Sequence, residues 1–244
     1  MTQDTAEYAV IGVGSIAEAI VTGLSRSDEP PTILLSPRSR QRTARLAARY
    51  PAVRVAADNQ AAASGAGTVL LCLRPQDAAE TLATLRFRAD QRLISVMASV
   101  PSAELARLTG PVAEISRAIP ATAVAAAGHG FTPVFPGGSA AQRLFDGLGG
   151  SMVLGSEQLL DAVSVASATV AAHLAYLQTV SSWLVGQGAG LEDAQRLMAS
   201  VFAGATAEFA DESDFVALAR HHATPVGSTS TSNGRCGGRG SSPR

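Results

Sequence analysis

The sequence contains no lysine. All 19 of its basic residues are arginines and it has 20 acidic residues, so the formal net charge of the 244 residues is −1. A net charge this close to zero creates no general attraction for nucleic acid or for an anionic membrane surface. The absence of lysine also excludes every mechanism that needs a lysine amine at the reacting centre.

Cysteine is scarce as well. Cys72 and Cys236 are too few for a disulfide framework, and Cys72 falls in an apolar run where a small core residue is expected. No cluster of histidine, cysteine and acidic residues has metal-ligand spacing, so we predict no metal site. The polar start, residues 1–7, does not have the pattern of a signal peptide, and no apolar stretch is both long and uninterrupted enough to indicate a membrane span. We therefore expect a cytoplasmic protein.

Apolar residues are abundant, at 46% of the chain against 16% charged, which is typical of a well-buried α/β or helical protein. Strand and helix patterns alternate through the first half, with short connections between them. This alternation predicts βαβ units and a Rossmann-type, doubly wound parallel sheet. The expected strands are 8–13, 32–35, 53–56, 68–73 and 93–97, with two more at 111–116 and 130–134; the expected helices are 15–25, 40–50, 76–85 and 102–108.

The pattern changes after Gly150. Residues 157–185 are rich in Ala, Val, Leu and Ser without Pro, which predicts one long apolar helix, and residues 191–210 predict another. A helix that is apolar on most faces must be buried, and so short a segment offers few neighbours of its own. An all-α dimerisation domain is the favoured interpretation, and burial within one subunit is the alternative.

Three regions are expected along the chain. Residues 1–154 form the dinucleotide-binding domain, and residues 155–227 form the helical dimerisation and substrate domain. Residues 228–244 are Ser, Gly, Thr and Arg with almost nothing apolar, so we predict a disordered tail.

A glycine loop follows the first expected strand and opens the first helix. In Gly12-Val13-Gly14-Ser15-Ile16-Ala17, Gly12 permits a tight turn and Gly14 lets the backbone approach a pyrophosphate. Ala17 takes the small position at which helix and strand pack closely. The phosphates would contact the free N–H groups at the positive end of the helix, including those of Ser15 and Ile16.

The end of the second expected strand predicts which dinucleotide binds. An NAD site offers Asp or Glu there to hold the ribose 2′-hydroxyl, whereas this chain has Ser36-Pro37-Arg38-Ser39-Arg40. With no carboxylate to repel a 2′-phosphate, Ser36 and Arg38 favour NADP(H). A solvated basic helix start is the alternative reading, and it accounts for Arg42 and Arg45.

Together these motifs resemble the pyrroline-5-carboxylate reductase family. The stretch 11–24, IGVGSIAEAIVTGL, resembles the family's opening, and Leu73-Arg74-Pro75-Gln76 resembles its Val-Lys-Pro-Gln. Residues 93–99 resemble the family's fifth strand, and residues 117–120 resemble its Arg-Val-Met-Pro. The likeness runs in order to Gly227.

The resemblance implies an NADP-binding domain and a helical domain that intertwines with its copy in a homodimer or larger homo-oligomer. It implies an NADPH-dependent reductase of a cyclic imine acid, with further cofactor contacts at Asn59, Leu73, Arg74, Pro75 and Ala98. A protonated imine is already electrophilic, so hydride transfer needs mainly positioning. The related β-hydroxyacid dehydrogenases use a lysine, which this chain lacks, so that class is disfavoured.

The chain departs from the family where substrate should bind. The family's Gly-Ser-Gly-Pro-Ala-Tyr falls within residues 165–172, which contain neither Pro nor Tyr, and its Asn-Thr-Pro is here Ala121-Thr122-Ala123. These losses support an alternative: an NADP-binding protein of the same fold with a different substrate, or without efficient turnover.

A second family motif, Thr-Pro-Gly-Gly-Thr-Thr, has its counterpart at residues 224–229. The resemblance implies that Ser228 and Thr229 position the substrate through its carboxylate. The helix expected after this motif is replaced by the Ser/Gly/Arg tail. We hypothesise a reading-frame shift near Pro225, which the third-position base bias of the gene would test.

Overall fold

The computed structural model describes residues 5–122, 131–210 and 214–223. The chain divides into two compact units, Met1–Ala168 and Thr169–Arg244. The helix α7 (Glu157–Ser167), which was expected in the helical domain, falls within the first unit. The disorder expected for residues 228–244 concerns a segment outside the described residues.

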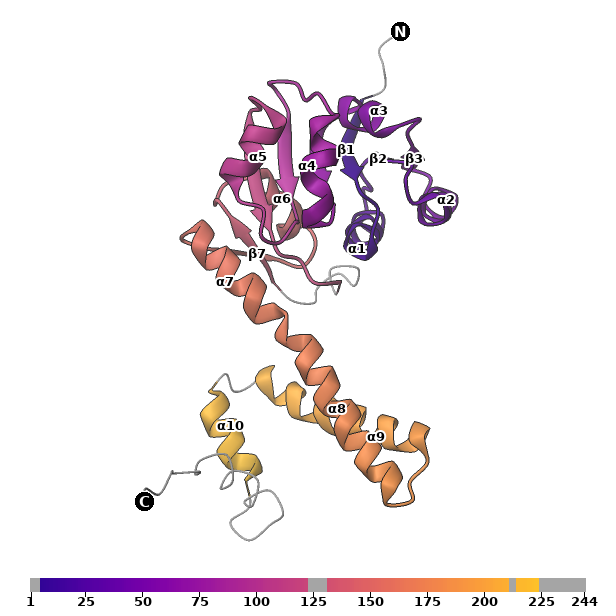
Figure 1. Ribbon diagram of the computed structural model, residues 1–244, viewed down its shortest axis with the longest axis vertical. Helices are drawn as coiled ribbons and strands as arrows, with labels where there is room; N and C mark the ends of the chain where they lie inside the picture. The colour runs from indigo at the N-terminus through magenta and orange to yellow at the C-terminus, as the bar shows by residue number, and fades with distance from the viewer. Residues whose placement is uncertain (1–4, 123–130, 211–213, 224–244) are drawn as a thin grey trace, which may run out of the picture. The chain divides into compact units, whose positions relative to one another are not determined.

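An eight-stranded sheet forms the first unit, with the strand order β3-β2-β1-β4-β5-β6-β7-β8 (Figure 1). The strands β1 to β6 pair in parallel, β7 runs antiparallel to β6, and β8 is parallel to β7. This confirms the predicted Rossmann-type sheet. The strands are β1 (Ala6–Ile11), β2 (Ile33–Leu35), β3 (Val53–Val55), β4 (Ala66–Leu71), β5 (Arg92–Ser95), β6 (Glu114–Ala118), β7 (Thr132–Phe135) and β8 (Ser151–Val153).

Helices cover both faces of this sheet. They are α1 (Ser15–Leu24), α2 (Arg40–Arg49), α3 (Asn59–Ser64), α4 (Pro75–Ala83), α5 (Ser102–Thr109) and α6 (Ala140–Asp146), followed by α7. Because side chains alternate along a strand, Leu70 of β4 joins a core with α1, α2 and α6, and Leu71 joins a core with α3, α4 and α5. The continuous apolar runs of the central strands follow from this burial on two faces.

The second unit is helical. It contains α8 (Thr169–Gly186), α9 (Leu191–Ala207), a 3₁₀ turn at Glu208–Ala210 and α10 (Phe215–His222). The single helix expected over 157–185 is assigned as α7 and α8, with Ala168 between them. Phe202 of α9 packs edge-on against His173 and Tyr176 of α8, with ring centroids 5.2 and 5.9 Å apart.

The helices of the second unit bury very little of their surface within the chain. Ser181 is the buried residue of α8, and Ala194 is that of α9. Trp183 is 63% exposed and Tyr176 is 55% exposed. The described helices of the second unit therefore leave most of one another's apolar side chains uncovered.

One helical stretch, Glu157–Gly186, is long and apolar enough to cross a membrane, contrary to the expectation from the sequence; an 18-residue window of it has a mean hydropathy of 1.4. Length and composition are weak evidence, because a helix that packs against another protein surface passes the same test.

Candidate cofactor site

The glycine loop at the carboxyl end of β1 is built as the sequence predicts. Gly12 has a φ of +90°, and a Cβ placed on it would lie 2.8 Å from the carbonyl oxygen of Cys72. Either condition alone requires glycine. The N–H of Gly12 donates to the hydroxyl of Ser36 at 2.9 Å, which ties the loop to the end of β2. Ser36 is buried behind the loop, so its influence on a cofactor would act through Gly12.

Gly14 is the N-cap of α1 and makes no side-chain cap hydrogen bond. A Cβ placed on Gly14 would meet no atom within 4 Å, so the backbone borders open space. The amides of Ser15 and Ile16 begin the helix at this point, where the helix dipole is positive. A phosphate group fits this arrangement of uncapped amides.

A groove of about 250 Å³ adjoins the loop, between the ends of β1, β2 and β4. Its walls are Gly12, Val13, Gly14, Arg38, Ser39, Cys72, Leu73, Arg74 and Asp77. The structure therefore brings Arg38 and Arg74 to the glycine loop, as expected for parallel strands whose carboxyl ends share one edge. Pro75 is the first residue of α4, where its missing N–H costs nothing.

Asp77 is the residue of this groove that the sequence analysis missed. The strand end at 36–40 carries no carboxylate, but the carboxylate of Asp77 lies 3.7 Å from the guanidinium of Arg38. The sequence analysis considered the strand end alone, and so missed an acid that lies beside Arg38 in space. A signal was available, because β2 and β4 flank β1 in this topology and Asp77 lies in the first turn of the helix after β4.

Arg42 and Arg45 do not face the groove as free cations. Arg42 donates to Glu18 of α1 at 2.9 Å and to the Ser15 hydroxyl at 3.3 Å. Arg45 pairs with the other oxygen of Glu18. These two arginines fasten α2 to α1, which leaves Arg38 as the guanidinium of this segment that lines the groove.

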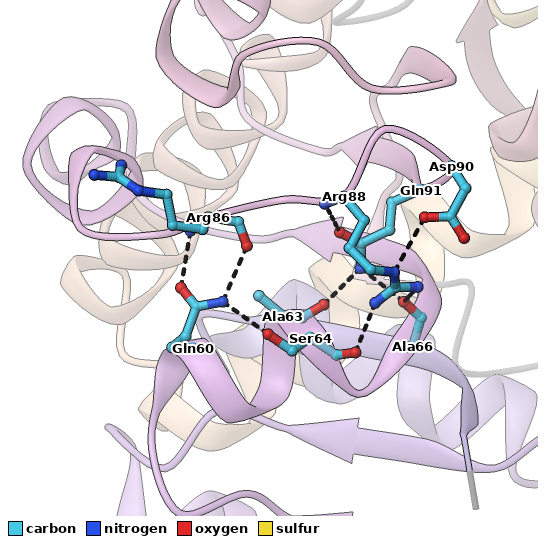
Figure 2. Close-up of polar contacts among 8 residues, drawn as sticks. All are labelled: Gln60, Ala63, Ser64, Ala66, Arg86, Arg88, Asp90 and Gln91. Atoms are coloured by element: carbon cyan, nitrogen blue, oxygen red, sulfur yellow. Dashed lines mark hydrogen bonds and ion pairs between the residues drawn. The ribbon is translucent and has the colours of Figure 1, made fainter. Parts of the chain in front are cut away.

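A second groove, of about 430 Å³, continues beyond Arg38 and includes Asn59 and Gln60 of α3. Figure 2 shows how α3 is held in place. The amide of Gln60 exchanges two hydrogen bonds with the backbone of Arg86, at 2.8 and 2.9 Å. Buried Gln91 donates to the carbonyls of Ala63 and Ala66, at 2.6 and 2.7 Å. Asn59 is thus presented from a firmly anchored helix.

The loop after β5 contains Ala98, one of the expected cofactor contacts, and its neighbour Ser99. Ala98 is partly exposed, and Ser99 has a φ of +60°, a left-handed conformation that costs a residue with a side chain free energy. It is the only non-glycine residue with positive φ in the part of the chain that is described. Strain of this kind is found preferentially at functional sites.

Cys72 lines the first groove but is poorly suited to react. Burial raises the pKa of its thiol to about 12, so the thiol stays protonated at physiological pH. We assign it no role in proton transfer. Among the described residues, no three His, Cys, Asp or Glu side chains are placed to hold a metal ion.

Arg117 is fully buried at the end of β6 and is engaged in ion pairs. Its guanidinium contacts Glu157 at 2.7 Å and Asp161 at 2.8 Å, both on α7. Glu157 also accepts hydrogen bonds from the amide and the hydroxyl of Ser102, each at 2.7 Å. This cluster fastens the first turn of α7 to the sheet, which is a structural role.

The predicted substrate-positioning residues, Ser228 and Thr229, lie outside the described residues. So does the rest of the motif at 224–229. Thr122, the one residue retained from the family's Asn-Thr-Pro, is exposed.

Residues 7–99 match the family model described as NADP oxidoreductase coenzyme F420-dependent. The chain is 28% identical to pyrroline-5-carboxylate reductase 2 of Bacillus subtilis over 207 aligned residues. The alignment covers 80% of this chain and 74% of that protein. The crystal structure of 1-pyrroline-5-carboxylate reductase from Streptococcus pyogenes matches with a TM-score of 0.79 at 20% identity, over 94% of this chain and 89% of that one. Pyrroline carboxylate reductase from Plasmodium falciparum, solved with NADP bound, matches with a TM-score of 0.76 at 15% identity, over 96% and 89%.

Proposed function

We propose that the chain is a member of the pyrroline-5-carboxylate reductase family and an NADPH-dependent reductase of the C=N bond of a cyclic imine acid. The observation that carries this proposal is the groove beside Gly12 and Gly14. An uncapped helix N-terminus and two arginines, Arg38 and Arg74, meet there. A dinucleotide with an additional phosphate fits this set of donors.

Each part of the groove would hold one part of NADP(H). The amides that begin α1 would bind the pyrophosphate, and Arg38 would bind the 2′-phosphate. Arg74, Leu73 and Pro75 would border the chain of phosphates and sugars, and Asn59 the adenosine end. Ala98 and Ser99 would border the nicotinamide, which supplies a hydride when the cofactor is bound.

The demands on the substrate side are modest. A protonated imine already attracts hydride, so the protein has to hold the imine carbon in place and bind the carboxylate of the substrate. Ser228 and Thr229 are our candidates for that contact. No lysine is needed, in agreement with the composition.

We propose that the protein acts as a homodimer through α8 and α9. These helices expose several apolar residues, of which Leu174, Trp183, Leu197 and Val201 are each more than half exposed within one chain. Exposed apolar area on this scale is typical of surfaces that another protein covers. The proposed division is the cofactor domain at 1–154, the helical domain at 155–227 and the tail at 228–244, in a cytoplasmic enzyme of proline biosynthesis.

One observation favours a second candidate, an NADP-binding protein with another substrate or without efficient turnover. Where the family has Gly-Ser-Gly-Pro-Ala-Tyr, residues 165–172 read VASATVAA. Val165 is 74% exposed and Val170 is 62% exposed. The cofactor groove retains its polar groups, whereas this segment has lost the family's proline and tyrosine.

Two assays on the full chain separate the candidates. Consumption of NADPH with pyrroline-5-carboxylate, measured by absorbance, is the expected result. Binding of NADPH by calorimetry without turnover on pyrroline-5-carboxylate or any other cyclic imine acid would favour the second candidate. Failure of the folded chain to bind NADPH would contradict both.

A further inference from the structure

Asp77 joins the two arginines that line the cofactor groove. It is the third residue of α4, and its side chain is 23% exposed. Arg74 donates to both of its carboxylate oxygens, from Nε at 3.0 Å and from one terminal nitrogen at 3.2 Å. Arg38 approaches from the loop after β2, with a terminal nitrogen 3.7 Å from the same carboxylate.

The two arginines are held with different strength. Arg74 makes a forked, charge-assisted pair with Asp77, which fixes the direction of its guanidinium. The separation of 3.7 Å between Arg38 and Asp77 is an ion pair without a hydrogen bond. Arg38 is also 63% exposed, so its guanidinium can turn to another anion at little cost.

A 2′-phosphate bound by Arg38 would lie close to the Asp77 carboxylate. Such a phosphate carries about −1.5 to −2 charges at neutral pH and competes with Asp77 for the same guanidinium. The two anions also repel each other across the groove. A ribose with a free 2′-hydroxyl experiences neither effect, because it carries no charge there.

Resting on the proposed binding of NADP(H), we propose that Asp77 is a specificity-determining residue of the groove. Its carboxylate orients Arg74, competes with the 2′-phosphate for Arg38, and so narrows the preference for NADP(H) over NAD(H). The sequence pattern at the end of β2 sets the direction of that preference, and Asp77 limits its size.

Calorimetric titration of Asp77→Asn with adenosine 2′,5′-bisphosphate and with 5′-AMP tests this. These probes occupy the adenosine half of the site and need neither substrate nor turnover. We expect the Kd ratio of the two probes to shift about five- to tenfold towards the bisphosphate, the order of magnitude for removing one unit charge from a solvent-exposed groove. The shift should shrink at about 1 M salt, where charges are screened beyond about 3 Å.

Asp90→Asn is the matched control. It removes the same charge from the same unit, at an exposed ion pair with Arg88 that is outside both grooves. We expect the Kd ratio of Asp90→Asn to equal that of the wild type. A similar shift in both variants would mean that net charge, not position, is responsible, and would overturn the proposal.

Arg38→Ala and the double variant Arg38→Ala/Asp77→Asn complete a thermodynamic cycle. The gain from Asp77→Asn should be smaller when Arg38 is absent, because only the direct repulsion between Asp77 and the 2′-phosphate then remains. An unchanged ratio in Asp77→Asn, or a gain of the same size with and without Arg38, would overturn the proposal. Should the wild type bind no NADPH, the proposed function fails, but the Kd ratio of the two probes still tests the role of Asp77. If neither the wild type nor Asp77→Asn binds either probe, both proposals are overturned.

Discussion

Arg38 extends from the end of β2 with its side chain largely in solvent, while its neighbours Arg42 and Arg45 are engaged with Glu18. Three nearby arginines in the sequence therefore have two different roles. Within α2, Arg42 and Arg45 fasten this helix to α1. Arg38 lies before that helix, on the wall of the groove, where its charge is available to a ligand.

We expect Arg38→Ala to weaken binding of NADPH by about 1–3 kcal/mol, because a charge-assisted hydrogen bond to the 2′-phosphate is lost. Binding of NADH should be unchanged. Calorimetry with both dinucleotides measures the two affinities. Arg49→Ala, at the far end of α2, is the control and should leave both unchanged; an equal loss for NADPH and NADH in Arg38→Ala would contradict the assignment.

Ser99 is the second residue whose role can be tested alone. Its φ of +60° is accessible to glycine without strain and is least accessible to a β-branched side chain. We expect Ser99→Val to lower the free energy of unfolding by about 1–3 kcal/mol and Ser99→Gly to change it by less than about 1 kcal/mol. Urea denaturation of both variants gives the comparison. Equal stability of Ser99→Val and the wild type would show that the loop adopts another conformation in solution.

At the scale of elements, α7 is attached to the sheet by a buried cation. Arg117 leaves β6 with its side chain 1% exposed, and α7 supplies both of its acidic partners. The Nε atom of Arg117 is buried without a partner in the described structure, so the charge depends on Glu157 and Asp161 for its compensation. An isolated buried charge would cost far more than the pairs contribute to stability.

Arg117→Met should destabilise the protein by about 2–4 kcal/mol, because both carboxylates lose their partner and α7 loses its attachment. Thermal unfolding followed by circular dichroism measures this. Arg107→Met removes an arginine from an exposed pair with Glu104, and we expect no measurable change there. Comparable losses in the two variants would contradict a special role for Arg117.

The attachment of α7 should also depend on pH. Burial alone would raise the pKa of Glu157, but hydrogen bonds from Ser102 and Arg117 outweigh it and lower the pKa below its ordinary value. The stabilisation is therefore fully present above the unfolded pKa of about 4.3 and is lost as pH falls through the folded value. Unfolding free energies of the wild type and Glu157→Gln should converge as pH is lowered from 7 towards 3. A constant difference would argue against this pair.

For the whole molecule, the sharpest contrast is between the two units. The sheet unit buries large apolar side chains on both faces, whereas α8 and α9 expose most of theirs. A single helix pair has too little surface to bury an apolar helix on all sides, so a second copy of the chain is the partner that we propose.

Trp183→Glu should shift the protein from dimer to monomer, because it places a charge in the proposed interface. Sedimentation velocity measures the mass, and circular dichroism checks that the helices persist. Val55→Glu changes an exposed apolar residue of the sheet unit, at β3, and should leave the mass unchanged. A wild-type monomer, or a Trp183→Glu dimer, would contradict the proposed assembly.

Local pattern was enough for the order of the main strands and helices and for the glycine loop. The period of apolar residues reports burial, and the positive φ at Gly12 needs a residue type that can be read directly. Several short elements escaped this reading: α3, α6 and α10 have six to eight residues each, so a period is hard to recognise in them. Their positions depend on contacts such as those of Gln60 and Gln91 with segments more than twenty residues away.

The sequence by itself therefore determined the fold class, the glycine loop and the basic character of the β2 end, because each depends on residues that are close together in the chain. Only the tertiary structure decided which arginine near the end of β2 lines the groove, which helix Arg117 holds, and that the Asp77 carboxylate lies beside Arg38. Asp77 is 39 residues from Arg38, and the two meet because parallel strands bring their carboxyl ends to one edge of the sheet. Electrostatic interactions depend on distance in space, and distance along the chain does not reveal it.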